Sequence, residues 1–140
     1  MKIAIVASKF NKRISENLVI GAKKALKENA LEKPKEFWVP GAFELPLACK
    51  WLSSKYDGLV AVGTVIRGET NHYDHVANVA SDGIAEVSRN QGTPIGFGLI
   101  TAKNVDQALA RSSDNDENLG YRAAKALIEM ISLRSEIDKN

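Results

Sequence analysis

The run at residues 59–66 constrains the fold more than any other part of this sequence, because it is largely apolar at both odd and even positions. Such a strand is typical of the centre of a parallel sheet that helices cover on both faces. Three other short runs rich in β-forming residues stand at 3–7, 36–39 and 94–100. A pattern with helical spacing follows each of the four runs. The chain is therefore predicted to be an α/β protein with right-handed βαβ units and a four-stranded parallel sheet.

The predicted helices rest on apolar residues at helical spacing and on start and stop signals around them. The polar stretch at 112–118 is expected to connect the last two helices. The helices run from about Ile14 to a stop near Asn29, from about 44 to 55, through Val76, Ala80, Ile84 and Val87, from a start at Asn104 with Gln107, and through Leu119, Ala123, Leu127 and Ile131.

Length and composition are those of an ordinary globular protein and exclude several classes of function. The 140 residues suffice for one domain, which is expected to span 1–140. A formal net charge of +2 and scattered basic residues argue against nucleic acid or an acidic membrane surface as a partner. The apolar start is too short for a signal peptide, and no stretch reaches the roughly 20 apolar residues of a membrane span. We therefore expect a soluble cytoplasmic protein, or a plastid one whose transit peptide was removed.

The residues that directly follow each strand are the ones to search for chemistry, because open α/β sheets bind ligands beyond the carboxyl ends of their strands. Two of these segments carry a phenylalanine, Phe10 and Phe43. Either one alone is more simply a core residue, but two on one sheet edge suggest a stack for a flat ring. Phe97 lies inside the fourth run and is most simply a core residue. The segments after the strands are 8–11, 40–44, 67–72 and 101–102.

The segment from Thr64 to His72 joins a strand end, a glycine turn and a helix start. Free backbone N–H groups at a helix start attract anions, and Thr70 adds a hydroxyl donor, so a phosphate-sized ligand would fit. The segment matches no standard phosphate-binding pattern. His72 either caps or packs against the helix end, or it shuttles protons near neutral pH.

No metal or redox centre is expected. His72 and His75 stand three residues apart, but two protein ligands seldom suffice for a metal and no third is evident nearby. The single cysteine, Cys49, stands in an apolar run and is expected to be a buried, inert thiol. Arg111 ends a short helix. It is a solvated surface residue unless it turns inward, where its rigid fork would suit a phosphate.

Five segments together resemble the lumazine synthase family in their order and spacing, over essentially the whole chain. The second and third of them are the most specific. The segments are Ala-Ser-Lys-Phe-Asn at 7–11, Val-Pro-Gly-Ala-Phe-Glu-Leu-Pro at 39–46, the stretch 63–73, the stretch 94–101 with its Phe97-Gly98, and 107–111, which ends at Arg111.

The resemblance implies a three-layer, flavodoxin-like α/β sandwich and a transferase of riboflavin biosynthesis. The implied reaction is the penultimate step of that pathway. It condenses 5-amino-6-(D-ribitylamino)uracil with 3,4-dihydroxy-2-butanone 4-phosphate to 6,7-dimethyl-8-ribityllumazine, and it needs no cofactor or metal. The resemblance also implies roles for matching residues. In the pyrimidine and ribityl part of the site, Phe10, with Asn11 beside it, would stack on the pyrimidine, Thr64, Val65 and Ile66 would contact it, and Ala42, Phe43 and Glu44 would hold the ribityl chain and the ring edge. Glu69 and Thr70 would bind the phosphate, with charge from Arg111, His72 would transfer protons, and Phe97 would reach the site of a neighbouring subunit.

The chain departs from the family pattern in two places. Many members carry a connection rich in glycine and lysine after the arginine, whereas here residues 112–118 are acidic and contain no lysine. That leaves less positive charge near the phosphate, and Glu69 lowers it further. The chain also starts directly at its first strand, without the N-terminal extension associated with the sixty-subunit capsid. We therefore expect a homopentamer, or paired pentamers, with a functional link to riboflavin synthase.

Three alternatives remain open at this stage. The archaeal type of riboflavin synthase shares the fold and would disproportionate two lumazine molecules, although Phe43, His72 and Arg111 favour lumazine synthase. A flavin- or lumazine-binding protein could retain the pocket without catalysing the reaction, and the altered connection after Arg111 supports that interpretation. A generic flavodoxin-like nucleotide-binding module would leave the match of five separate segments unexplained.

Overall fold

The computed structural model describes residues 1–31, 33–67 and 72–140, with only the backbone of His72. Its centre is a sheet of four parallel strands in the order β2-β1-β3-β4. This confirms the predicted fold class. The strands are β1 (Ile3–Ser8), β2 (Lys35–Val39), β3 (Gly58–Ile66) and β4 (Ile95–Ala102).

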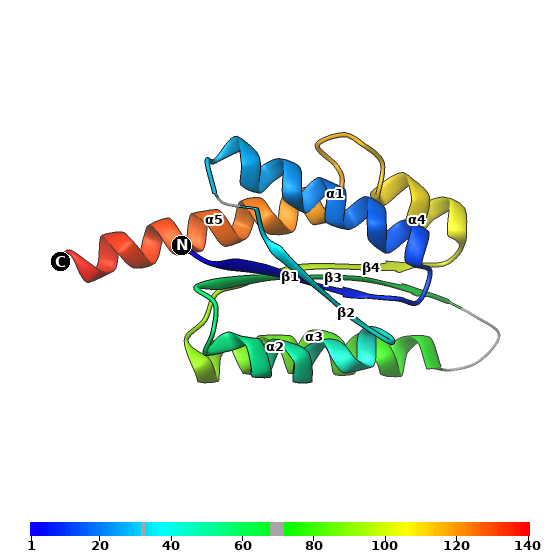
Figure 1. Ribbon diagram of the computed structural model, residues 1–140. Helices are drawn as coiled ribbons and strands as arrows, with labels where there is room; N and C mark the ends of the chain where they lie inside the picture. The colour runs from blue at the N-terminus through cyan, green and yellow to red at the C-terminus, as the bar shows by residue number, and fades with distance from the viewer. Residues whose placement is uncertain (32, 68–71) are drawn as a thin grey trace.

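Helices cover both faces of the sheet and complete a three-layer sandwich (Figure 1). One face carries three helices and the other carries two, preceded by a short 3-10 turn. The first group is α1 (Lys12–Glu28), α4 (Val105–Arg111) and α5 (Leu119–Asp138), and the second is the 3-10 turn η1 (Ala42–Glu44), α2 (Leu45–Ser53) and α3 (His72–Gln91). In the part of the chain that the structure describes, none of these helices is both long and apolar enough to cross a membrane.

The apolar residues form two cores, one on each side of the sheet. Val60 and Val62 of β3 pack with α1 and α5, whereas Leu59 and Ala61 pack with α2 and α3. Alternate residues of one strand thus enter opposite layers, which is why residues 59–66 are apolar at both parities. Cys49 is buried in the second core, as predicted.

One of the predicted boundaries that is wrong lies at the end of β4. The strand was expected to stop at Ile100, with Thr101 and Ala102 in the loop after it. Both residues continue the strand and pair with Val65 and Ile66 of β3. The pairing extends because β3 is itself nine residues long. The predicted start of α4 is confirmed: the side chain of Asn104 accepts a hydrogen bond from the backbone N–H of Gln107 at 2.8 Å.

Candidate active site

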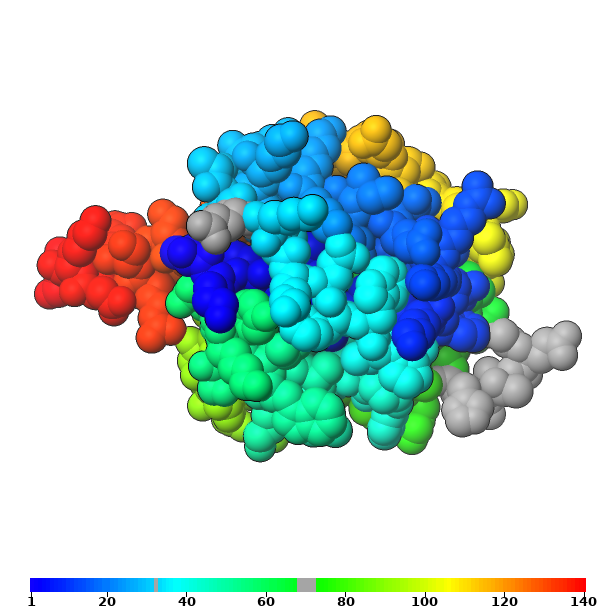
Figure 2. Space-filling view, in the orientation of Figure 1, coloured from blue at the N-terminus to red at the C-terminus, as the bar shows by residue number. Residues whose placement is uncertain are grey.

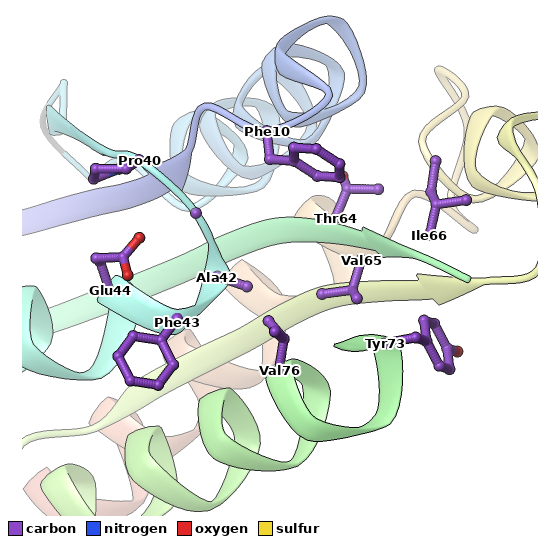
Figure 3. Close-up of a pocket in the computed structure, with 11 residues that line it drawn as sticks. Phe10, Pro40, Ala42, Phe43, Glu44, Thr64, Val65, Ile66, Tyr73 and Val76 are labelled. Atoms are coloured by element: carbon purple, nitrogen blue, oxygen red, sulfur yellow. The ribbon is translucent and has the colours of Figure 1, made fainter. Parts of the chain in front are cut away.

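An open cleft of about 460 Å³ lies at the carboxyl ends of β1, β2 and β3. It lies where α1 leaves β1 toward one face of the sheet and α3 follows β3 on the other face, which is the switch point where open α/β sheets bind ligands. The lining is mostly apolar (Figure 3). It consists of Phe10, Pro40, Gly41, Ala42, Phe43, Glu44, Thr64, Val65, Ile66, Tyr73 and Val76.

Two of the three aromatic residues that line this cleft are exposed, and neither of these two belongs to a core. Phe10 follows β1 and Phe43 lies in η1, and each is 59% exposed. The interpretation of either residue as core is therefore wrong, because both lie beyond the strand ends, where the helices no longer cover them. In Figure 3 the ring of Phe10 extends toward Thr64. An exposed aromatic ring beside an apolar cleft can stack on a flat ligand at little conformational cost.

The segment after β2 forms one wall of the cleft. Gly41 is extended, with φ −151° and ψ 178°, and its carbonyl accepts a hydrogen bond from the N–H of Glu44 at 3.1 Å. The turn buries Ala42 and leaves Glu44 half-buried at the cleft. Glu44 is the one charged residue in the lining among the described residues, so this carboxylate supplies the acceptor for hydroxyl or ring N–H groups of a ligand.

The end of β3 forms the floor of the cleft. Val65 lies opposite Ala42 and Val76, and the three side chains point toward one another (Figure 3). Thr64 is almost fully buried, and within the described part of the chain its hydroxyl has no hydrogen-bond partner. Buried polar groups are normally paired, so this buried hydroxyl at the end of β3 is an exception among the described residues.

Three residues of the predicted site whose side chains the structure describes do not line this cleft within the single chain. Asn11 is the N-cap residue of α1 in a left-handed conformation, φ 53°, and its side chain makes no capping bond. Phe97 is 45% exposed on β4, against Ile84 and Ala85 of α3. The expectation that Phe97 is a core residue is therefore wrong, because β4 is an edge strand and, among the described residues, no strand pairs with its outer edge. The third of these residues is Arg111.

The guanidinium of Arg111 turns toward the sheet. Its Nη1 donates to the carbonyl oxygen of Thr101 at 2.7 Å, which places it at the carboxyl end of β4. The side chain stays exposed, and the cleft lining does not include it. A guanidinium held by one donor keeps its other N–H groups for an anion.

The rest of the predicted phosphate segment lies outside the described residues. This applies to Glu69 and Thr70, and to the side chain of His72. The backbone of His72 starts α3, and the following residues Tyr73 and Val76 line the cleft, so position 72 adjoins it. Within the described residues no three His, Cys, Asp or Glu side chains gather as metal ligands would.

The family model for 6,7-dimethyl-8-ribityllumazine synthase matches residues 1–135 of the 140-residue chain. The chain belongs to this family. The family is one of transferase-type enzymes that make lumazine in riboflavin biosynthesis. The fold is likewise the flavodoxin-like α/β fold expected for a lumazine synthase.

One solved structure shows only a remote similarity. It is a crystal structure of a GDP-L-fucose synthetase from Naegleria fowleri, with 12% sequence identity and a TM-score of 0.37. The comparison covers 99% of this chain and 47% of that chain. A similarity this low indicates nothing about the function of this chain.

Four residues of the lining were not assigned a role in the site from the sequence. Pro40 and Gly41 belong to the turn pair that closes β2, and their position beside Phe43 was the available signal. Tyr73 follows His72 directly. Val76 was assigned to a helix face from its spacing alone, and a periodic pattern does not distinguish a residue that faces the core from one at the open end of the sheet.

Proposed function

We propose that this chain condenses 5-amino-6-(D-ribitylamino)uracil with 3,4-dihydroxy-2-butanone 4-phosphate to 6,7-dimethyl-8-ribityllumazine. The observation that carries the proposal is the family match over residues 1–135. The cleft supports it, because an apolar slot with two exposed aromatic rings and one carboxylate suits a flat ring that bears a hydroxylated chain.

The pyrimidine would lie between Phe10 and the end of β3. Phe10 stacks on the ring, and Thr64, Val65 and Ile66 contact its edge and face. The wall formed by Ala42, Phe43 and Glu44 holds the ribityl chain, with the Glu44 carboxylate accepting from ribityl hydroxyls or the ring edge. Asn11, directly after Phe10, completes the proposed set on this side.

The phosphate of the second substrate would bind at the start of α3, near Glu69 and Thr70. Arg111 supplies the positive charge, because its guanidinium is already held at the carboxyl end of the sheet by the bond to Thr101. Guanidinium groups pair with phosphate through two parallel hydrogen bonds.

The reaction needs proton transfers and alignment. The primary amine attacks the ketone and loses water to give an imine; a proton leaves the neighbouring carbon and inorganic phosphate leaves the next one; the ribityl-bearing nitrogen then closes the second ring with loss of a second water. His72 takes and returns these protons, since an imidazole titrates near neutral pH. The cleft residues hold the two reactants in contact, and such alignment can supply roughly 7–11 kcal/mol in the best models.

Each site would be completed by a second copy of the chain, with Phe97 of one subunit closing the cleft of its neighbour. Large apolar side chains left exposed on the single chain support a homo-oligomer, which we propose to be built from pentamers. Among them is a stripe at helical spacing along η1 and α2, formed by Phe43, Leu47 and Trp51. Others are Phe97 on β4 and Met130, Leu133 and Ile137 on the end of α5 that projects beyond the sheet (Figure 2).

The test is the initial rate of lumazine formation, followed by product fluorescence in wild type and two histidine variants. His72→Ala should lower kcat by roughly 10²-fold or more without reaching the uncatalysed rate, because alignment of the substrates remains. His75→Ala is the matched control, since His75 is exposed one turn further along α3. Equal rates in the two variants would contradict the role of His72. A wild-type rate at the uncatalysed background would contradict the reaction itself.

A further inference from the structure

The side chain of Asn118 joins three parts of the structure. It is 2% exposed. Asn118 is the last residue of the connection 112–118, and its side chain lies where this connection meets α1 and the start of α5. Its Nδ2 donates to the carbonyl oxygens of Asn17 at 3.2 Å, Ser112 at 3.0 Å and Ser113 at 3.1 Å. Its Oδ1 accepts from the N–H of Tyr121 at 3.0 Å and caps α5. The amide therefore uses its donors and its acceptor at once, which a carboxylate or a hydroxyl does not reproduce.

Gly21 leaves the space that this amide needs, and Gly120 lets the start of α5 approach the backbone of α1. A Cβ at Gly21 of α1 would lie 2.1 Å from Oδ1 of Asn118. A Cβ at Gly120 of α5 would lie 1.9 Å from the carbonyl oxygen of Leu18. The side chain of Asn118 therefore lies where α1 and α5 approach each other closely.

Two of the three carbonyls that Asn118 holds belong to the residues directly after Arg111. On their other side, the hydroxyls of Ser112 and Ser113 both donate to the carbonyl oxygen of Leu109, at 3.2 Å and 3.0 Å. Hydrogen bonds to Asn118 and to Leu109 therefore hold the residues at the end of α4 from two sides. The backbone that carries Arg111 is fixed in this way while its guanidinium donates to Thr101.

The same bonds keep the acidic connection in place. Asp114 and Glu117 are exposed, and they face cations of the neighbouring helices. Asp114 lies 3.9 Å from Lys24 of α1, and Glu117 lies 3.7 Å from Arg122 of α5. A connection released from Asn118 would let these carboxylates move relative to Arg111, where they would oppose an anion.

We propose that Asn118 is a positioning residue for Arg111. It holds the connection 112–118 in place, so that the guanidinium keeps the orientation in which it binds the substrate phosphate. The inference rests on the proposed function, since it takes Arg111 to be the phosphate anchor. Asn118 touches neither substrate and acts only through the backbone that follows Arg111.

The test separates the donors of Asn118 from its cap. Asn118→Asp keeps an oxygen for the N–H of Tyr121 and removes both donors. Asn118→Ser also keeps a capping oxygen and replaces the two amide donors by a single hydroxyl donor on a shorter side chain, in case the aspartate variant does not fold. Asn29→Ala is the matched control, because Asn29 also donates from Nδ2 to a backbone carbonyl, that of Ala25 at 2.9 Å, at the other end of α1. Hydrogen exchange of the amides at 112–117 and the KM for each substrate are measured in all variants.

Exchange at 112–117 should accelerate at least about tenfold in the Asn118 variants and not in Asn29→Ala. The KM for the butanone phosphate should rise roughly tenfold, as expected for losing about 1.4 kcal/mol of phosphate binding, while the KM for the ribitylaminouracil stays near wild type. In an Arg111→Ala background the Asn118 substitution should add little to the KM for the butanone phosphate.

Four results would overturn the inference. Unchanged exchange at 112–117 would show that Asn118 does not hold the connection. An equal rise in both KM values, or an undiminished effect in the Arg111→Ala background, would show a general structural role instead of a positioning one. Absence of turnover in wild type would overturn the proposed function and with it the link to catalysis, and the exchange result would then report on the connection by itself.

Discussion

Gly120, the second residue of α5, marks a very close approach of that helix to α1. A Cβ at this position would lie 1.9 Å from the carbonyl oxygen of Leu18, although real Cβ contacts stay above 3.0 Å. Because that oxygen belongs to the backbone of α1, no side-chain rotation relieves the clash. The two helices would have to move apart, which would loosen the contact between α1 and α5 beside which Asn118 lies.

Gly120→Ala should therefore destabilise the protein even though alanine is the better helix former. Overpacking costs about 1–3 kcal/mol and occasionally more, and a contact with helix backbone belongs at the upper end of that range. The gain in helix propensity returns at most about 1 kcal/mol. The expected net loss is about 2 kcal/mol, or about 8 °C in Tm if each kcal/mol lowers it by about 4 °C.

The assay is urea unfolding followed by circular dichroism, at equal protein concentrations. Gly92→Ala is the control: its φ of 67° imposes backbone strain, but no atom lies within 4 Å of the added Cβ. Strain of that kind costs about 1–2 kcal/mol without moving any helix. A Gly120→Ala variant as stable as wild type, or more stable as helix propensity alone predicts, would refute the packing argument.

Three more predictions concern the cleft, the shared site and the buried thiol. Phe10→Ala should leave urea unfolding nearly unchanged, because the ring is largely exposed. It should weaken lumazine binding roughly 5–150-fold in a fluorescence titration, as expected for losing a stack of about 1–3 kcal/mol, whereas Phe10→Tyr should bind near wild type. If Phe97 serves the neighbouring subunit, poorly active Phe10→Ala and Phe97→Ala chains refolded together should recover about a quarter of the wild-type sites, and no recovery would place both residues in one chain's site. Burial raises the pKa of the Cys49 thiol from 9.0 to about 12, so the folded state keeps a proton that the unfolded state loses above about pH 9. Wild type should therefore lose about 2 kcal/mol more stability than Cys49→Ala between about pH 8 and about pH 10.5, and parallel pH curves of the two would contradict this.

The sheet was predictable because its signals are local and redundant. Residues 59–66 are apolar at both parities, and Val60 and Leu59 indeed enter opposite cores. The start of α4 was predictable because the side chains of Asn104 and Gln107 accept hydrogen bonds from backbone N–H groups at the helix start. Asn104 accepts from the N–H of Gln107, and Oε1 of Gln107 accepts from the N–H of Lys103. The end of β4 was missed because it depends on the length of the partner strand, which lies far away in the sequence.

Side-chain placement at the site was predictable only in part. Phe10 and Phe43 follow strands, and position alone did not decide between a core and a cleft, because that depends on how far the covering helices extend. The exposure of Phe97 depends on β4 being an edge strand, which is a property of strand order. The role of Asn118 was invisible from the sequence, because its partners lie on α1 and in the connection and come together only in three dimensions.

The measurement that tests the central claim most directly is the joint yield of lumazine and inorganic phosphate from the two purified substrates with wild-type protein. The account predicts many turnovers per chain, well above the uncatalysed rate, with one phosphate released for each lumazine formed. Phosphate and lumazine appearing only at the uncatalysed rate, with lumazine or a flavin bound tightly in the cleft, would contradict it and leave a binding protein in place of an enzyme.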